Sequence, residues 1–421
     1  MEKYKLICCA NGNEVKLEKP FDFQTGCHEN SLLKTVYLQD KLELRKDLPG
    51  LWKYINWLPV NGINEYSFGP VTYKSQGLAK ELGLYNLWIS FNGYYPDFGA
   101  YYKTCTFKEL HAVLVIQYAK EHGVDKLVLA SAGNTAVAFA YIAEFLKFPM
   151  VCVVPEKCMA NVQAPNMVFQ NSNIIMLTGG DYSDALNVAR RLATLKGYTY
   201  EGGAKNFARR AGLGVSYMDA VTRIGRIPDH YFQGVGSGTG AIAAWHSNMQ
   251  FVSDGSYGTY MTKLHLAQNK PMTPMVSAWA AGRNFIKQEV DVPQVDNILD
   301  LVAAPVLTNK YPAYGISGGV YDALRATGGL MYGVSNDELF EAGDVFKRTE
   351  GRDVNPPAAV ATAALIRAVK EHKVRKGEII LLNITGAGRE QRLRDLSIKP
   401  IKPNHVITKE ITDEQLMEMP V

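Results

Sequence analysis

From about Leu84 onward, the spacing of apolar residues predicts short strands that alternate with amphipathic helices. Residues 126–130 (KLVLA) form a compact apolar run of strand length, and residues 135–147 follow with the periodicity of a helix. Residues 149–154 (PMVCVV) are strand-like again. Because a strand, a helix and another strand in succession build parallel sheets that helices cover on both faces, the pattern predicts an α/β fold.

The same alternation continues through the second half of the chain. Aspartate is a favourable N-cap, so a helix is expected to begin at Asp181, and prolines in a first turn favour another that begins at Pro356. The predicted elements are, in order, a strand at 173–177, a helix from 181 to about 195, a strand at 230–234, a helix from about 239, a helix from 356 to about 371 and a strand at 378–384. Residues 253–260 and 288–297 are expected to be surface loops.

The length of the chain predicts that these elements form two lobes. At 421 residues, the chain exceeds the size at which one hydrophobic core usually stays undivided. We expect a small module at 1–40, a large domain formed by 41–110 and 216–405, a small mobile domain at 111–215 and a C-terminal tail at 406–421.

Composition and charge argue against several classes of protein. The hydrophobic content of 47% and the charged content of 20% are those of an ordinary globular protein. The net charge of +4 is spread along the chain, which argues against a nucleic-acid partner and suits a small anionic substrate. No stretch approaches the roughly 20 apolar residues that cross a bilayer, and the first residues lack the apolar run of a secretory signal. We therefore expect a cytoplasmic protein with no membrane partner.

Cysteines near the N-terminus raise the question of a metal site. Six cysteines are too sparse for a disulfide scaffold, and we expect them to be thiols. Cys8, Cys9, Cys27 and His28 are ligand types that bind zinc tetrahedrally, as in a zinc ribbon with a nucleic-acid role. Adjacent cysteines, however, chelate poorly compared with a C-x2-C pair. A metal-free N-terminal module is therefore favoured over a degenerate zinc ribbon, and no metal is expected.

One lysine lies where its chemistry can be tuned. In KTCTFKEL (103–110), Lys108 follows Phe107 just inside a helix that is expected to begin near Thr106. A helix N-terminus and the shielding of an aromatic ring both lower the pKa of an ammonium group, which favours the nucleophilic amine. By itself this motif is weak, because most lysines in a first helical turn are solvated.

Three further segments place glycines and hydroxyl groups directly after predicted strands. SAGNT (131–135) exposes backbone N–H groups at a helix start, which favours an anion such as a carboxylate. GVGSGTG (234–240) has the character of a phosphate cradle, although it is neither a Walker loop nor a dinucleotide fingerprint. NITGAG (383–388) directs the hydroxyl of Thr385 over the sheet. Ordinary turn chemistry remains the alternative for each segment.

These segments, in this order, resemble the fold-type II pyridoxal-phosphate enzymes and, within them, the threonine synthase family. KTCTFKE is similar to the cofactor-lysine motif P-T-G-S-F-K-D, SAGNT to an S-x-G-N-T loop, GVGSGTG to the phosphate loop and ITGAG to a T-G-x-G segment. Residues 70–84 resemble the threonine-bearing loop and helix of that family. WLPV (57–60), EGGAKNFARR (201–210) and HYFQGVGSGTGAIAAW (230–245) bring the likeness closer still to the cysteate synthases. The likeness extends from about Tyr4 to Arg394.

The resemblance implies pyridoxal 5′-phosphate as cofactor and two lobes, each with a mainly parallel twisted sheet flanked by helices. The large domain would bind the cofactor, and the small domain would bind the substrate. Lys108 would be the catalytic residue and would hold the cofactor as a Schiff base. The other cofactor-binding residues would be Asn134, Gly236, Ser237, Gly238, Thr239, Gly240 and Thr385. A threonine hydroxyl at the pyridine nitrogen favours elimination and replacement over transamination.

Substrate binding is expected from the SAGNT loop and from basic residues. Backbone N–H groups of the loop would surround the substrate carboxylate, while the other anionic groups require cations. The expected substrate-binding residues are Thr104, Ser131, Ala132, Gly133, Thr135, Lys205, Arg209 and Arg210, with Lys103 as a further candidate cation. Because neighbouring residues on a helix diverge by about 100°, at least one of Arg209 and Arg210 is expected on a solvated face.

The reaction that the resemblance implies is a β-replacement. O-phospho-L-serine would lose phosphate to leave an aminoacrylate, and sulfite would then add to it and yield L-cysteate. Lys108 would be the base for the Cα proton. The partners would thus be a small phosphorylated amino acid and a small nucleophile, and a homodimer is expected by analogy.

Four positions depart from the family pattern and keep other functions open. Cys105 and Glu109 replace a glycine and an aspartate of the lysine motif, while Val137 and Ala211 stand where an arginine and an aspartate are expected. One alternative is a related enzyme that uses another nucleophile or another activated amino acid. A second is threonine synthase activity on O-phosphohomoserine, and a third is a cofactor-binding regulator without catalytic activity.

Overall fold

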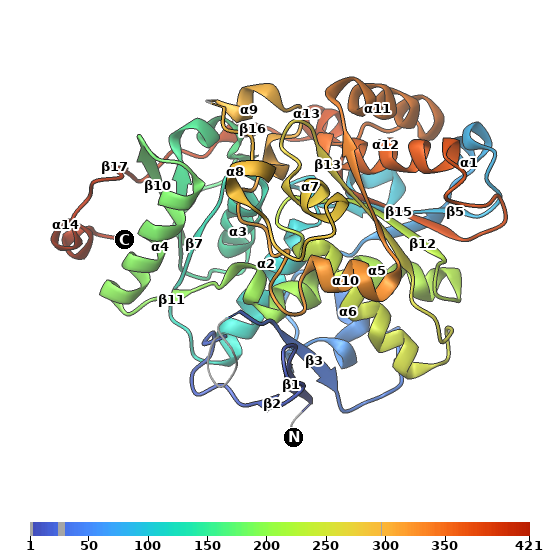
Figure 1. Cartoon of the computed structure of the whole chain (residues 1–421). Coiled ribbons are helices and arrows are strands. Elements are labelled where there is room, and N and C mark those ends of the chain that lie inside the picture. Colours follow the sequence, from blue (N-terminus) through green and yellow to red (C-terminus); the bar gives the residue numbers. More distant parts are fainter. Residues whose placement is uncertain (1–2, 24–29, 296) are drawn as a thin grey trace.

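The computed structural model describes residues 3–23, 30–295 and 297–421, which form two α/β lobes and a small N-terminal sheet (Figure 1). The larger lobe is built on a seven-stranded sheet in the order β14-β13-β12-β15-β5-β4, with β6 paired to β5. Its strands are β4 Val71–Lys74, β5 Leu87–Tyr95, β6 Ala100–Tyr101, β12 His230–Gly234, β13 Lys263–Asn269, β14 Leu330–Val334 and β15 Ile380–Ala387. From β14 to β5 the strands are parallel, and β4 runs antiparallel to β5.

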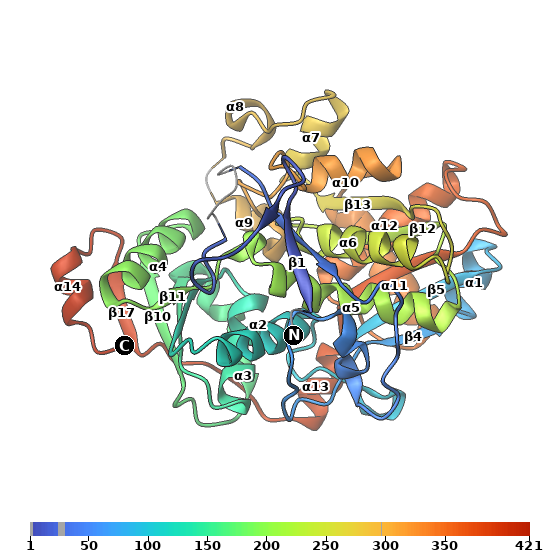
Figure 2. The same cartoon turned by 90° about the horizontal axis from the view of Figure 1, so that it is seen from below.

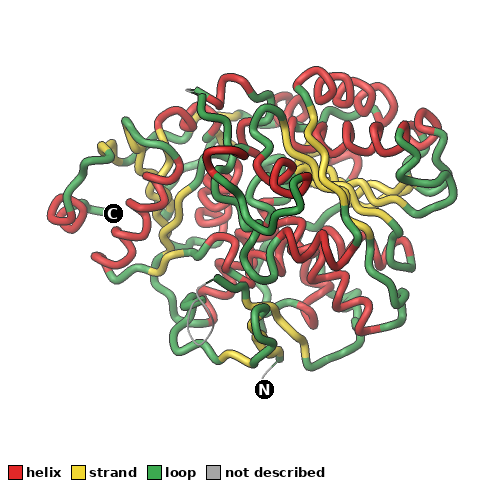
Figure 3. The backbone as a smooth tube through the Cα atoms, viewed as in Figure 1, coloured by secondary structure: helices red, strands yellow, loops and turns green. Residues whose placement is uncertain are grey.

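Helices cover both faces of this sheet (Figures 1 and 3). On one face, α12 packs against the central strands, and α11 packs on α12. Six alanines of α12 are small enough to let the helix approach the sheet closely, and all of them are buried. On the other face lie α5 and α6. The helices of this half of the molecule are α1 Gly77–Leu82, α2 Lys108–Glu121, α5 Phe207–Ile224, α6 Thr239–Asp254, α7 Pro274–Ala280, α8 Gln288–Asp291, α9 Ile298–Leu301, α10 Val320–Thr327, α11 Asn336–Glu350, α12 Pro356–Lys370 and α13 Arg389–Asp395.

The smaller lobe has a five-stranded parallel sheet in the order β11-β7-β8-β10-β17. Helices α3 Asn134–Phe145 and α4 Tyr182–Lys196 lie on its opposite faces, as Figure 2 shows. Between the lobes, α2 packs against both α3 and α5. The strands of this sheet are β7 Leu127–Ala130, β8 Met150–Pro155, β10 Ser172–Thr178, β11 Thr199–Tyr200 and β17 His405–Thr408.

The segment expected as a C-terminal tail is part of the smaller lobe. Strand β16 Ile398–Pro400 pairs with β9 Gln163–Pro165, and β17 then adds to the edge of β10. Helix α14 Asp413–Glu418 packs on α4, where an ion pair of 2.6 Å joins Asp413 to Arg191. An open edge of β10 and an apolar side of α4 therefore explain why this segment packs on its own chain.

The N-terminal sheet has the order β2-β1-β3 and consists of β1 Tyr4–Cys8, β2 Glu14–Val15 and β3 Leu33–Tyr37. Cys27 and His28, which the zinc interpretation also requires, lie outside the described residues. Cys8 is disulfide-bonded, so the expectation of six thiols is wrong at that position. The other described cysteines, Cys9, Cys105, Cys152 and Cys158, are free.

Apolar periodicity placed the main elements well. Strand β12 has the predicted bounds, and α4 begins after Asp181, which caps it by accepting hydrogen bonds from Ser183 N and Asp184 N. Strand β15 starts two residues later than predicted, because Glu378 instead closes a turn and contacts His230 at 2.9 Å. The predicted loop at 288–297 contains the short helix α8. Within the described ranges, no helix has both the length and the apolar character that a membrane span requires.

Candidate active site

A cleft of about 2270 Å³ lies where the strands of both sheets end. Ser131, Glu156 and Gly179 line it directly after β7, β8 and β10 of the smaller lobe. Val235 follows β12 of the larger lobe, and Thr385 lies near the C-terminal end of β15. The carboxyl ends of parallel strands are the usual ligand-binding edge of such sheets. The four segments singled out in the sequence therefore meet in one place.

Lys108 is the first residue of α2, and its side chain lines the cleft. Its ammonium nitrogen lies 4.7 Å from the centroid of the Phe107 ring, and we find no hydrogen-bond acceptor for it among the described residues. Burial and, to a smaller extent, the positive charge of Arg209 lower the pKa of Lys108 to about 7, while Glu201 opposes the shift. A neutral amine is thus available near neutral pH, as attack on an aldehyde requires.

The turn that leads into Lys108 is fastened to the end of β15. The backbone N–H of Phe107 donates to the carbonyl of Thr385 at 3.0 Å. Cys105 has a left-handed backbone with a φ of 58°, at the position where the family motif has a glycine. Its thiol donates to the carbonyl of Gly388 at 3.4 Å. Cys105 therefore keeps the left-handed backbone that a glycine would adopt here, and its thiol adds a hydrogen bond to Gly388.

The glycine loop between β12 and α6 is packed so closely that side chains are excluded. A Cβ on Gly236 would lie 3.0 Å from the backbone of Leu307, and one on Gly240 would lie 2.6 Å from the amide of Gln233. The hydroxyl oxygens of Ser237 and Thr239 are 2.9 Å apart at the start of α6. Backbone N–H groups and two hydroxyls at the positive end of a helix make this loop suitable for a phosphate.

The SAGNT loop presents fewer free N–H groups than its sequence suggests. The hydroxyl of Ser131 accepts hydrogen bonds from Gly133 N at 3.2 Å and from Ala136 N at 2.9 Å. In the described structure, the backbone N–H groups of Asn134 and Thr135 have no such acceptor, and both residues line the cleft at the start of α3. These two groups are suited to a carboxylate.

Two of the predicted basic residues line the cleft. Lys205 lies in the 3-10 turn before α5, and Arg209 lies in the first turn of α5. Arg209 forms a buried ion pair with Glu201, at 2.5 Å between Nη2 and Oε2. The side chain of Asn206 caps α5 by accepting a hydrogen bond from the backbone N–H of Arg209 at 3.1 Å.

Arg210 does not reach the cleft, contrary to the expectation of substrate contact. Its guanidinium donates to the carbonyl oxygens of Leu33 and Ala204, and its side chain is buried beneath the N-terminal sheet. The expectation that one of the two arginines faces solvent is therefore wrong, because β3 covers the outer face of α5. Thr104 is also buried outside the cleft, and Lys103 does not line it either.

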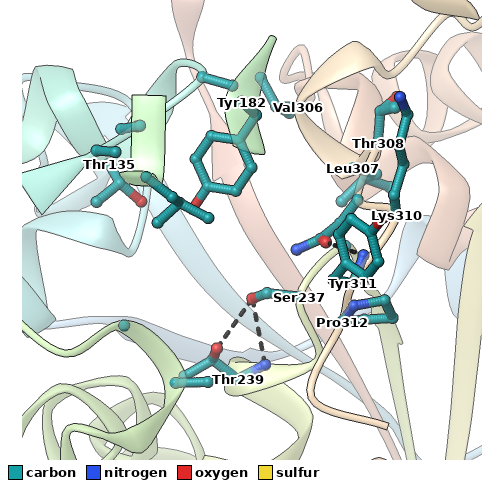
Figure 4. Close-up of a pocket in the computed structure, with 18 of the residues that line it drawn as sticks. Thr135, Tyr182, Ser237, Thr239, Val306, Leu307, Thr308, Lys310, Tyr311 and Pro312 are labelled. Atoms are coloured by element: carbon teal, nitrogen blue, oxygen red, sulfur yellow. Dashed lines mark hydrogen bonds between the residues drawn. The ribbon is translucent and has the colours of Figure 1, made fainter. Parts of the chain in front are cut away.

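Sequence reasoning missed one wall of the cleft, which residues 305–313 form. A Cβ on Gly133 would lie 3.1 Å from Val306 Cγ1, and the backbone N–H of Ala313 donates to the carbonyl of Ser237 at 3.0 Å. This segment therefore touches both the SAGNT loop and the glycine loop. Figure 4 shows Lys310 and neighbouring side chains on the side of the pocket opposite Thr135. The prolines at 305 and 312 indicate only turns in the sequence, so no pattern predicts this role.

Comparison with known families places this geometry in context. A family model described as "Pyridoxal-phosphate dependent enzyme" matches residues 72–386, which include Lys108, the glycine loop and Thr385. The chain belongs to this family. Pyridoxal phosphate is therefore its cofactor, and the residues present fit it. Lys108 offers an amine for the aldehyde, and the glycine loop, where an added Cβ would crowd Leu307 or Val320, offers backbone N–H groups for the phosphate. The hydroxyl of Thr385 faces the same cleft.

Relatives within the pyridoxal-phosphate dependent enzymes match nearly the whole chain. The cysteate synthase of Methanocella paludicola is 49% identical over 406 residues, which cover 96% of this chain and 94% of the relative. That of Methanocella arvoryzae is 44% identical over 405 residues, with 96% and 95% covered. That of Methanosarcina barkeri is 43% identical over 423 residues and covers both chains completely. The predicted likeness to the cysteate synthases is thus confirmed.

Solved structures of this family confirm the predicted fold. Maize serine racemase superposes with a TM-score of 0.56 at 16% identity, over 75% of this chain and 87% of that chain. The L-serine ammonia-lyase of Rhizomucor miehei superposes with a TM-score of 0.59 at 15% identity, over 78% of this chain and 98% of that chain. At such identities the likeness shows the fold alone, which is the two-lobed fold-type II architecture.

Proposed function

We propose that the protein converts O-phospho-L-serine and sulfite to L-cysteate and inorganic phosphate, and the name cysteate synthase that its relatives carry supports cysteate as the product. The identity of 43–49% over nearly the full length of those relatives is the observation that supports this most strongly. Val137 and Ala211, the positions that depart from the expected pattern, do not line the cleft. Val137 and Ala211 themselves therefore contribute no side chain to the cleft.

The proposed reaction replaces one substituent on the β-carbon with another. The Cα–H bond and the Cβ–O bond of phosphoserine break, and the oxygen leaves with the bonding electron pair as inorganic phosphate. The sulfur lone pair of sulfite forms the new Cβ–S bond, and a proton returns to Cα. When bound, pyridoxal phosphate supplies the electron sink that makes the Cα proton acidic.

We assign the binding roles from the positions of the side chains. Lys108 would hold the cofactor covalently, and residues 236–240 would bind its phosphate through backbone N–H groups and the hydroxyls of Ser237 and Thr239. Asn134 and Thr385 would contact the ring from opposite lobes. The N–H groups at the start of α3 would bind the substrate carboxylate, with Ser131 fixing the loop.

The proton transfers fall to Lys108. The free amine at its Nζ has a pKa of about 7, which leaves a large neutral fraction at neutral pH. That amine accepts the proton from Cα and later returns it to the same carbon.

The family also suggests where the protein acts and how it assembles. We propose a homodimer in the cytoplasm, and both points rest on the resemblance alone. Light scattering during size-exclusion chromatography measures the molar mass. A mass close to twice the 46.6 kDa of one chain supports the dimer, and a mass close to that of one chain contradicts it.

A product assay tests the reaction directly. Purified enzyme with bound cofactor is incubated with phosphoserine and sulfite, and cysteate and phosphate are quantified by anion-exchange chromatography and mass spectrometry. Equal amounts of the two products support the proposal. Parallel reactions contain phosphoserine with sulfide, or phosphohomoserine alone. If one of these parallel reactions yields product and the reaction with sulfite yields no cysteate, the corresponding alternative replaces the proposal.

Covalent labelling tests the assignment of Lys108 separately. Borohydride reduction of the enzyme with bound cofactor, followed by digestion, is expected to yield a pyridoxyl group on the peptide that contains Lys108. The Lys108→Ala variant should carry no label while retaining the circular dichroism of the wild type. A label on any other lysine of the wild type contradicts the assignment.

A further inference from the structure

Arg210 is a buried cation that lacks a carboxylate partner. Its side chain is 2% exposed and does not line the active-site cleft. The guanidinium donates to the carbonyl oxygens of Ala204 and Leu33, while its Nε has no partner. Among the residues that the structure describes, no aspartate or glutamate forms an ion pair with it. Because an uncompensated charge is costly to bury, an anion beside Arg210 would stabilise the protein.

A small pocket lies beside this guanidinium, between β3, α5 and α6. Its volume is about 10 Å³, which is room for one molecule or ion of the size of water. Thr35, Arg210 and His246 line it, one from each of the three elements. The pocket shares no lining residue with the active-site cleft, so the two are separate.

His246 brings a second unpaired nitrogen to the same pocket. Its Nε2 is buried and has no hydrogen-bond partner in the described part of the chain. Burial, and then the positive charges of Arg210 and Lys34, lower the pKa of His246 well below 6.5, so the ring is neutral at neutral pH. A neutral imidazole carries one N–H group, which lies on Nε2 in one of its two tautomers. The other polar side chains that line the pocket are Thr35, Ser247 and Gln250.

We propose that this pocket binds one small monovalent anion of the size of chloride, which accepts hydrogen bonds from Arg210 Nε and His246 Nε2. A water molecule would accept the same hydrogen bonds but would leave the buried positive charge uncompensated. A pocket of about 10 Å³ is too small for phosphate, sulfate or an amino-acid carboxylate. The site is thus distinct from those that hold the substrates and the cofactor, and the inference does not depend on the proposed function.

The anion connects the N-terminal sheet to the body of the protein. Arg210 donates to the carbonyl of Leu33 in β3, and Thr35 of the same strand lines the pocket. The residue before this strand, Leu32, lines the active-site cleft. Apolar walls that include Trp57 and Phe207 lower the local dielectric constant and so strengthen the attraction between the anion and the guanidinium. Binding of the anion should therefore raise the stability of the folded protein by mass action.

Thermal unfolding of the enzyme with bound cofactor tests the site in solution. The Tm is measured as sodium chloride replaces sodium gluconate at constant ionic strength, because gluconate is too large for the pocket. Chloride is expected to raise the Tm of the wild type by about 2 °C or more, with saturation. Arg210→Gln and His246→Phe should abolish this rise. Arg223→Gln, which alters an exposed arginine in the last turn of α5, is the control and should retain it.

Bromide locates the anion directly, because it resembles chloride and scatters X-rays anomalously. Crystals soaked in bromide should show an anomalous peak between Arg210 Nε and His246 Nε2. Density for water without such a peak overturns the inference. A peak together with a Tm that responds to chloride equally in wild type and His246→Phe indicates binding at crystal concentration only, and this also overturns it. If Arg210→Gln does not fold, His246→Phe decides by the same measurements, because it keeps the cation and an aromatic ring.

Discussion

The hydroxyl of Tyr66 donates a hydrogen bond of 2.8 Å to the carboxyl group of Glu109, the residue that follows Lys108. The backbone N–H of Thr104 donates to the same carboxyl at 2.5 Å. Glu109 is fully buried, and burial raises its pKa to about 7. Glu109, whose side chain is longer than the aspartate of the family motif, thus stabilises the turn before Lys108 through these hydrogen bonds.

Removal of this carboxyl is expected to destabilise the protein. Glu109→Ala leaves two buried donors without an acceptor, so the free energy of unfolding should fall by about 2–4 kcal/mol. Tyr66→Phe should cost about 1–2 kcal/mol, because it removes one donor and leaves the bond from Thr104 intact. Urea denaturation of each variant measures these differences. If Glu109→Ala were as stable as Tyr66→Phe, the Glu109 carboxyl would not stabilise this turn as argued above.

Glu109 also predicts a specific pH dependence. Its pKa is raised from 4.5 to about 7 in the folded state, so between these values the folded protein holds a proton that the unfolded chain has lost. The contribution of Glu109 to stability therefore falls as pH rises through this window. Glu109→Gln lacks this titration, so its stability relative to wild type should improve from pH 5 to pH 7. A constant difference over that range would refute the prediction.

Attachment of the cofactor should follow the titration of Lys108. The neutral amine is the reactive form, so the rate of reconstitution of the cofactor-free protein should rise with pH with a midpoint near 7. Glu201 raises the pKa of Lys108 and Arg209 lowers it. Glu201→Gln should therefore move the midpoint to lower pH, and Arg209→Gln should move it to higher pH. Stopped-flow absorbance measures the rates, and a wild-type midpoint above 9 contradicts the burial of the amine.

Gly238 and Gly255 flank the two ends of α6 and offer a matched pair of substitutions. Both have left-handed backbones, with φ of 81° and 73°. A Cβ on Gly238 would overlap Val320 Cγ2, whereas one on Gly255 meets nothing within 4 Å. Gly255→Ala should cost about 1 kcal/mol and leave cofactor affinity unchanged. Gly238→Ala should weaken cofactor binding at least about 10-fold, as measured by fluorescence titration. Equal affinities in the two variants would show that the loop does not bind the cofactor.

A buried chain of side chains at the far end of the larger sheet predicts acid sensitivity. Tyr332 contacts His265 Nδ1 at 2.8 Å, His265 Nε2 contacts His230 Nδ1 at 2.9 Å, and His230 Nε2 contacts Glu378 at 2.9 Å. Burial lowers the pKa of His265 well below 6.5. Below pH 6.5 the unfolded chain therefore binds a proton that the folded protein does not, so the stability of the protein decreases as the pH is lowered.

The contribution of His265 can be isolated by substitution. His265→Phe keeps the ring that stacks on Phe232, at 4.2 Å between centroids, and removes the titrating group. Between pH 6.5 and pH 5, the slope of unfolding free energy against pH should become shallower by about 1.4 kcal/mol per pH unit. Tyr332→Phe breaks one hydrogen bond but keeps both histidines, so it should lower stability without changing the slope. Identical slopes for wild type and His265→Phe would contradict the prediction.

The sequence predicted most of the site because its residues are adjacent to elements with strong periodicity. Ser131 and Val235 follow apolar strands, Thr385 lies near the end of one, and parallel strands bring such positions to one edge. Arg210 could not be predicted, because its partner is the carbonyl of Leu33, 177 positions away. The wall at 305–313 was missed for a related reason. It has no periodicity of its own, and it gains a role only because it packs against the SAGNT loop and the glycine loop.

The smaller sheet also has a consequence for synthesis on the ribosome. Asn404 accepts a hydrogen bond from the backbone of Ile174 across a separation of 230 residues, and β17 then completes the edge beside β10. Until that strand emerges, a nascent chain exposes an unpaired β10 edge, which is a surface that recruits other strands. A premature stop anywhere between β10 and β17 would thus release a product prone to aggregate, even though the whole segment around Lys108 is already present.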